Sequence, residues 1–325
     1  MKSLLESKKS FYEFIPANKL FLLLLLGGFI SGCSSITPTK SAETGPAETS
    51  KITWSAPVDT AAKTYLLGCE SDYEKARGLL AELSKTGKQY STQDLLKGIN
   101  SLDIILDKQM NLAGLYANVH PHPEIRAAAE QCEQNLVSLI SEISLSRPLY
   151  NQIANVDLAS LDQEDHRFVE HMLRDYKRSG VDKDDATRAR IKLLNEEINL
   201  TGQQFDKNIR DGSRQLIIDS VSDLKGLPQD YIDAHKPDAQ GKIILTTAYP
   251  DYFPFMQFAE NDELRKKFYV LFRQQAYPEN KQVLQQLLAK RYELARLLGY
   301  KNFSEYITED KMIKSPANAQ SFIDK

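Results

Sequence analysis

The residues of this 325-residue chain that could best carry out metal chemistry are its five histidines. They are His120, His122, His166, His171 and His235. A catalytic zinc needs about three protein ligands and an open position for water. The motif His-Glu-x-x-His on a helix supplies two of these ligands, but no histidine here is followed by glutamate. The spacing therefore predicts no catalytic residue and no metal ligand in this sequence.

Two histidine pairs come close to a metal-binding pattern. His166 and His171 bracket a glutamate, as in an inverted zinc motif, but they are five residues apart instead of four. On a helix this separation turns the two side chains about 140° apart, so they cannot share one ion. His120 and His122 flank a proline, and we expect them to form the entry turn of a helix.

Two other groups of side chains have a simple structural explanation. Acidic residues precede a predicted helix, where carboxylates favour the positive end of the helix dipole, so we expect a helix start. They are Asp182, Asp184 and Asp185. A calcium site is the alternative, and it would need a full cage of oxygen ligands. Aromatic residues crowd a short segment, and we expect a buried core there in preference to a peptide-binding wall. They are Tyr249, Tyr252, Phe253, Phe255 and Phe258.

The N-terminal residues have the pattern of a bacterial lipoprotein signal. Lysines precede an apolar run over residues 20–30, whose eleven residues rise about 16 Å as a helix, too little for a bilayer core of about 30 Å. The run ends in Ile30-Ser31-Gly32-Cys33, which resembles a lipobox. We expect residues 1–32 to be a signal peptide, Cys33 to be lipidated and residues 33–60 to be a flexible tether, so that a lipid anchor holds the chain at the bacterial cell envelope, on the periplasmic or outer-membrane side.

The remaining cysteines, Cys69 and Cys132, both fall on predicted helices. An exported location permits a disulfide between them, provided that the two helix faces meet. Two free, buried thiols are the alternative, and this is the interpretation that we favour from the sequence.

The rest of the chain has the apolar spacing of helices almost throughout. Only residues 214–219 and 242–247 resemble strands, so the sequence predicts a mainly α fold with a small β element near residues 214–247. A helix starts at Ser315-Pro316, and the sequence ends about ten residues later, which we interpret as a truncation. The net charge of −3 and the pI near 6.0 argue against a nucleic-acid partner.

Several blocks of the sequence resemble the thimet oligopeptidase, oligopeptidase A and dipeptidyl carboxypeptidase family of zinc metallopeptidases. The resemblance covers roughly residues 65–325. Its specific blocks are residues 167–180 (RFVEHMLRDYKRSG), 188–209 (RARIKLLNEEINLTGQQFDKNI), 226–231 (GLPQDY), 249–277 and 289–312. Residues 120–132 (HPHPEIRAAAEQC) match more loosely.

The resemblance implies the N-terminal helical half of a two-lobed peptidase fold. It implies a helical domain over residues 61–212 and the truncated start of the catalytic region over residues 213–325. In the complete family enzyme, zinc is the cofactor and short peptides are the substrates, and we expect this chain alone to bind no zinc and to be inactive. Two alternatives remain open: a non-catalytic envelope lipoprotein that binds peptides or acts as a scaffold, and one half of a split peptidase whose catalytic half is a separate chain.

Overall fold

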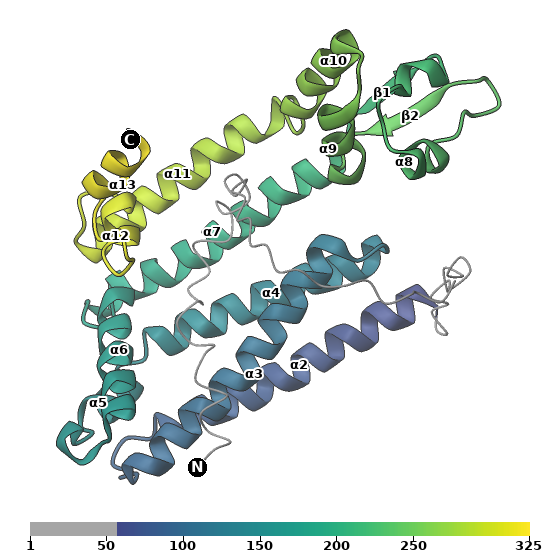
Figure 1. Ribbon diagram of the computed structural model, residues 1–325. Coiled ribbons are helices and arrows are strands. Elements are labelled where there is room, and N and C mark those ends of the chain that lie inside the picture. The colour runs from purple at the N-terminus through teal and green to yellow at the C-terminus, as the bar shows by residue number, and fades with distance from the viewer. Residues whose placement is uncertain (1–56) are drawn as a thin grey trace, which may run out of the picture. The chain divides into compact units, whose positions relative to one another are not determined.

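The computed structural model describes residues 57–325, which form helices α2 to α13 and one two-stranded sheet (Figure 1). The predicted mainly α fold is therefore confirmed. Cys33, the expected signal peptide and most of the expected tether lie outside the described residues. Among residues 57–325, no helix has both the length and the hydrophobicity that a membrane span requires. The domain boundary predicted at residues 212 and 213 stays a prediction.

The described residues group into two compact units, and the first comprises residues 57–79 and 96–133. Its helices are α2 (Val58–Leu83), α3 (Thr92–Val119) and α4 (Pro123–Ser144), and each of them continues into the second unit. The carboxylate of Asp72 on α2 accepts hydrogen bonds from Lys75 (2.8 Å), Lys108 (3.0 Å) and Gln109 (2.6 Å). These bonds, that from Lys75 foremost, hold the pKa of Asp72 below its usual range and join α2 to α3.

The second unit, residues 80–95 and 134–325, is built on an antiparallel pair of long helices. These are α7 (Asp185–Asp211) and α11 (Glu279–Leu298), which lie side by side in Figure 1. Buried aliphatic side chains form the seam between them, and charged pairs flank it. The seam holds Ile191, Leu194, Leu294, Ala295 and Leu298. The flanking pairs are Arg190–Glu293 at 2.7 Å and Lys290–Glu197 at 2.6 Å.

Two shorter helices lead into this pair. Helix α5 (Arg147–Ala154) is capped by the Ser146 hydroxyl, which accepts a hydrogen bond from the Leu149 amide at 3.3 Å. Helix α6 (Gln163–Ser179) ends at Gly180, as the sequence predicts, because that residue takes a left-handed conformation with φ 95°.

The small β element lies at one end of the α7–α11 pair (Figure 1). Strand β1 (Gln215–Ile218) pairs antiparallel with β2 (Ile243–Thr246), in the register Gln215↔Thr246 and Ile218↔Ile243. Alternate residues are buried against α8 (Gln229–Ala234), α9 (Tyr249–Phe258) and α10 (Asp262–Arg273). Leu216, Ile218, Ile243 and Leu245 make up this inner face of the sheet.

Two short helices lie at the opposite end of the α7–α11 pair (Figure 1). They are α12 (Phe303–Thr308) and α13 (Pro316–Ile323). The predicted start of α13 is confirmed, because the Ser315 hydroxyl accepts a hydrogen bond from the Asn318 amide at 3.2 Å. Phe322 and Ile323 on this helix are each 75% exposed.

Candidate functional site

The histidines singled out in the sequence do not come together into a metal site. On α6, Nδ1 of His166 lies 3.4 Å from a carboxylate oxygen of Glu170, and both side chains are about half exposed. Burial, followed by the neighbouring cation of Arg174, lowers the pKa of His171 on the same helix. No group of three or more His, Cys, Asp or Glu side chains in residues 57–325 is placed to hold a metal ion.

The His120-Pro-His122 segment is the helix-entry turn that the sequence predicts. Nδ1 of the buried His120 ring accepts a hydrogen bond from the His122 amide at 3.2 Å. The Arg126 guanidinium donates to the carbonyl oxygens of His120 (2.7 Å) and Pro121 (3.0 Å). Together these bonds fix the chain immediately before α4.

Asp184 acts at the start of α7, as expected. Its carboxylate accepts hydrogen bonds from the amide (2.9 Å) and the hydroxyl (2.7 Å) of Thr187. These bonds lower the pKa of Asp184, the bond from the amide most of all. The group is therefore a helix cap, which explains its position without a bound ion.

The aromatic segment around α9 is only partly core. Tyr252 and Phe255 are buried, but Tyr249, Phe253 and Phe258 are about half exposed. The expectation that all five rings are buried was therefore wrong. Because α9 packs on β2 and α10 with one side only, its opposite side remains on the surface.

Cys69 on α2 and Cys132 on α4 are joined in a disulfide, with their Cα atoms 6.1 Å apart. Both residues are almost completely buried. The preference for two free thiols was therefore wrong. The apolar spacing predicts one buried face on each helix, but it does not show that the two cysteine-bearing faces meet.

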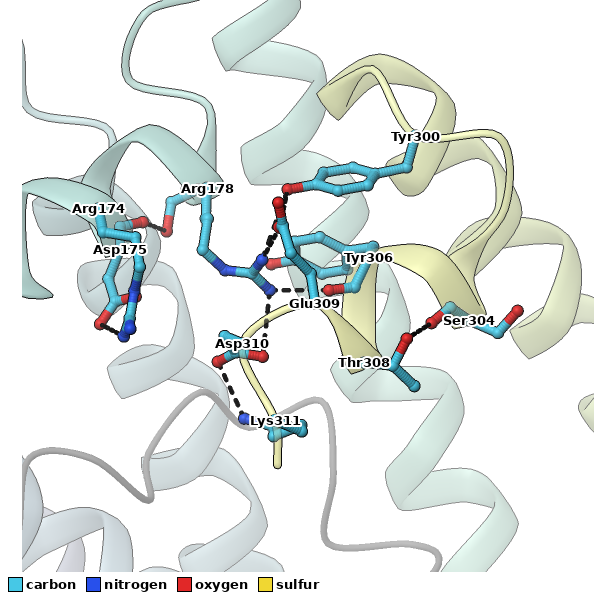
Figure 2. A network of polar contacts seen from close by, with 11 residues as sticks. Arg174, Asp175, Arg178, Tyr300, Ser304, Tyr306, Thr308, Glu309, Asp310 and Lys311 are labelled. Carbon is cyan, nitrogen blue, oxygen red and sulfur yellow. Dashed lines mark hydrogen bonds and ion pairs between the residues drawn. The ribbon is translucent and has the colours of Figure 1, made fainter. Parts of the chain in front are cut away.

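A polar network of the second unit surrounds Arg178, at the C-terminal end of α6 (Figure 2). Its guanidinium donates to the Tyr306 carbonyl oxygen at 2.7 Å and forms ion pairs with Glu309 and with Asp310, the latter at 3.4 Å. It also lies 5.0 Å from the centroid of the Tyr306 ring. Only 7% of the Arg178 side chain and 12% of the Asp310 side chain are exposed.

This network joins segments that are far apart in the sequence. Arg178 comes from α6, whereas all its partners come from the 300–310 stretch that contains α12 (Figure 2). The Tyr300 hydroxyl donates to Glu309, and burial, followed by this bond, raises the pKa of Tyr300. The Arg178 network fixes α12 and the residues after it against α6. The guanidinium and both carboxylates are ion-paired, so we assign the network a structural role.

A second polar cluster lies beside the small β element and joins β2 to α9. The Asp251 carboxylate accepts hydrogen bonds from the Thr246 amide (2.7 Å) and hydroxyl (2.6 Å), and it pairs with Nε2 of His235 at 3.0 Å. Nδ1 of His235 lies 2.8 Å from the carbonyl oxygen of Tyr231, and the two rings stack at 4.2 Å. Both ring nitrogens are thus occupied, so neither can take a proton from a nucleophile. The His235–Asp251 pair therefore stabilises the fold and is not part of a catalytic triad.

We predict that Asp251→Ala destabilises the fold by about 2 kcal/mol at pH 7, since it removes hydrogen bonds to a partly buried charged acceptor. Burial opposes ionisation of Asp251, but bonds from Thr246 and His235 outweigh it, so the pKa of Asp251 is lowered. A lowered carboxyl pKa stabilises the fold above the ordinary value near 4, and this stabilisation is lost as the pH falls through the lowered value. The check is urea unfolding of both proteins at pH 7 and pH 3. A difference that does not shrink at pH 3 would contradict this assignment.

Comparison with known proteins places these elements in one family. Residues 77–188 match the model of the neurolysin and thimet oligopeptidase N-terminal domain, and residues 255–325 match the model of peptidase family M3. The chain belongs to the thimet oligopeptidase and oligopeptidase A family. Family members similar to it include yeast (Saccharomyces cerevisiae) saccharolysin, 29% identical over 218 residues, and oligopeptidase A of Salmonella typhimurium, 27% identical over 256 residues.

The matches cover much of this chain but a minor part of those family members. The saccharolysin match spans 63% of this chain and 30% of saccharolysin, and the Salmonella match spans 73% and 38%. The chain therefore spans less than two fifths of the length of either relative. Residues 57–325 contain no set of side chains that fits the zinc implied by the family, so we derive no step through a metal.

The sequence missed both polar networks for a physical reason. Arg178 and its partners, from Tyr300 to Asp310, are 122 to 132 positions apart, and His235 and Asp251 are 16 apart. No periodicity links residues across such separations. The one available signal was that Arg178 and residues 300–310 fall in two blocks that both resemble the same family.

Proposed function

We propose that this chain is the N-terminal portion of a zinc oligopeptidase that, when complete, hydrolyses short peptides. The observation that carries the proposal is that both family matches occur in order, and that the Arg178 network joins them. The described residues would then form a frame that positions a catalytic region without contributing the metal ligands. The polar side chains of this frame would hold segments of the fold in place.

An exposed apolar stripe on α11 supports this proposal. Leu284, Leu288 and Tyr292 recur every four residues and are 42%, 56% and 54% exposed. Such a stripe on a helix is a surface that another helix or strand can cover. We assign it to contact with a further part of the peptidase fold, whether that part belongs to the same polypeptide or to a separate one.

The test of activity uses purified residues 1–325 and an internally quenched peptide in the presence of zinc. We expect no hydrolysis above the rate in buffer, because the sequence contains no His-Glu-x-x-His and the described residues offer no three-ligand set. Zinc-dependent cleavage by this polypeptide, abolished by a chelator, would contradict the proposal.

The complementary test adds a polypeptide that carries the His-Glu-x-x-His portion of a family member. Peptidase activity should appear on mixing, and Leu288→Asp should lower it at least about tenfold because it places a charge in the apolar contact. Gln282→Asp, at an exposed polar position on another side of α11, is the matched control and should have little effect. Stable binding without any activity would favour the non-catalytic scaffold instead.

We also propose that the protein is a lipoprotein of the bacterial envelope, anchored through Cys33. The lipobox pattern supports this, and so does the Cys69–Cys132 disulfide, since such bonds persist in oxidising compartments. Mass spectrometry of the chain purified from membranes should find acyl groups on Cys33. Cys33→Ser should abolish the acylation, whereas Ser35→Ala should retain it; an unmodified Cys33 would rule the anchor out.

A further inference from the structure

One surface of α9 and α10 combines exposed aromatic rings with basic side chains. Tyr249 and Phe253 on α9 are 49% and 53% exposed, and Tyr269 and Val270 on α10 are 45% and 44% exposed. Together with three exposed cations of α10 these residues define what we term the aromatic–basic face. It consists of Tyr249, Phe253, Lys266, Lys267, Tyr269, Val270 and Arg273.

The rings of this face form one continuous surface. Phe272, partly buried between α9 and α10, lies 6.0 Å from Tyr249 and 6.2 Å from Phe253, measured between ring centroids. The Arg273 guanidinium lies 5.9 Å from the Phe272 ring and 5.1 Å from the Tyr269 ring. The aromatic groups of α9 therefore continue into the basic side of α10 without a break.

Helix α10 is apolar on its inner side, and its outer side carries more cations than carboxylates. Phe268 is completely buried in the core below the sheet, with Leu264 and Leu271 packed beside it. On the outer side, Lys266 and Arg273 have no carboxylate within ion-pair distance among the described residues. Lys267 lies near the carboxylate of Asp219, and the exposed Glu263 is one helical turn from Lys266. The face thus carries three cations and keeps an excess of positive charge, although the whole chain has a net charge of −3.

We propose that the aromatic–basic face docks on an anionic lipid surface. Aromatic rings are suited to the boundary between headgroups and acyl chains, and lysine and arginine are attracted to anionic headgroups. The proposal rests on the lipid anchor proposed above, because an anchor at Cys33 would bring the face to the membrane at a high effective concentration. The face is at the end of the second unit that holds the small sheet, away from α12 and α13 (Figure 1).

The test places a single tryptophan on the face of the full-length chain. Trp54 is the one native tryptophan, so Trp54→Phe provides the background and Phe253→Trp the reporter. The purified protein is reconstituted with vesicles of phosphatidylglycerol and phosphatidylethanolamine that contain brominated acyl chains. We expect the bromines to quench about half of the reporter fluorescence, because the ring would sit at the acyl boundary.

Leu288→Trp in the same background is the matched control, since Leu288 is as exposed as Phe253 but lies on the apolar stripe of α11. It should lose little fluorescence. Lys266→Gln in the Phe253→Trp protein should weaken lipid contact about fivefold at low salt, as expected for one cation near an anionic surface. Lys281→Gln, an exposed lysine on α11, should leave the quenching unchanged.

Three results would overturn the proposal. One is equal quenching of the two reporters, another is quenching in neither, and the third is quenching that is as strong in pure phosphatidylcholine. A blue shift that depends on protein concentration and occurs without vesicles would assign the face to self-association instead. The mass of the purified chain reports acylation of Cys33 separately, so failure of the anchor and failure of the face can be told apart.

Discussion

Replacing Arg178 by alanine is expected to lower the free energy of unfolding by about 3 kcal/mol, since it removes a buried guanidinium together with its charged hydrogen bonds and its packing. The Asp310 side chain is 12% exposed and lies 3.4 Å from the guanidinium, and without Arg178 it would keep only its ion pair with Lys311 at 3.1 Å. The same change removes the bond to the Tyr306 carbonyl oxygen and exposes the Tyr306 ring to a cavity. Urea unfolding of the full chain, followed by circular dichroism, is the measurement.

A matched variant separates this effect from the general cost of losing a surface arginine. Arg265 forms an ion pair with Asp262 on α10, where the side chains are 37% and 81% exposed. Exposed pairs contribute little, so Arg265→Ala should cost less than about 1 kcal/mol. Arg178→Lys should lie between the two, because lysine keeps the charge but cannot present the planar fork of guanidinium donors. If Arg178→Ala cost no more than Arg265→Ala, the Arg178 network would not fix α12 against α6.

Removal of the Cys69–Cys132 disulfide is the second change with a large expected effect. The bond closes a loop across 63 positions of the chain, and a crosslink of that span restricts the unfolded chain by about 4 kcal/mol in the chain-entropy account. We therefore expect the double variant Cys69→Ala, Cys132→Ala to lose free energy of unfolding of about this size. Native protein treated with dithiothreitol should lose a similar amount.

The cysteine variants and dithiothreitol remove the same bond, so each serves as a control for the other. Dithiothreitol should not change the stability of the double variant, because it contains no such bond to reduce. The single variant Cys69→Ala should unfold much like the double variant and should also be insensitive to dithiothreitol. A native protein whose unfolding midpoint is the same with and without dithiothreitol would show that the two cysteines are not bonded in solution.

The helices could be predicted because each is specified by neighbouring residues. Asp184 and Ser315 start helices through local hydrogen bonds, and Gly180 ends one through its own backbone conformation. Strands β1 and β2 were equally visible as short apolar runs.

The contacts between elements could not be predicted in the same way. The disulfide depends on which faces of α2 and α4 meet, and the partial exposure of the α9 rings depends on which side of α9 meets the core. Neither the cysteine pairing nor the exposed side of α9 can be predicted from the residue spacing within one segment. The family resemblance supplied the order of the elements but not these pairings.

The Arg178 network has a consequence for exchanging parts between family members. Arg178 belongs to the segment that matches the oligopeptidase N-terminal domain, whereas Glu309 and Asp310 belong to the segment that matches peptidase family M3. A chimaera that took these two segments from different parents would inherit the cation from one and its carboxylates from the other. Unless both parents carry matching partners, a crossover placed between the two segments would bury a charge without its counterpart, so the two segments behave as one unit of exchange.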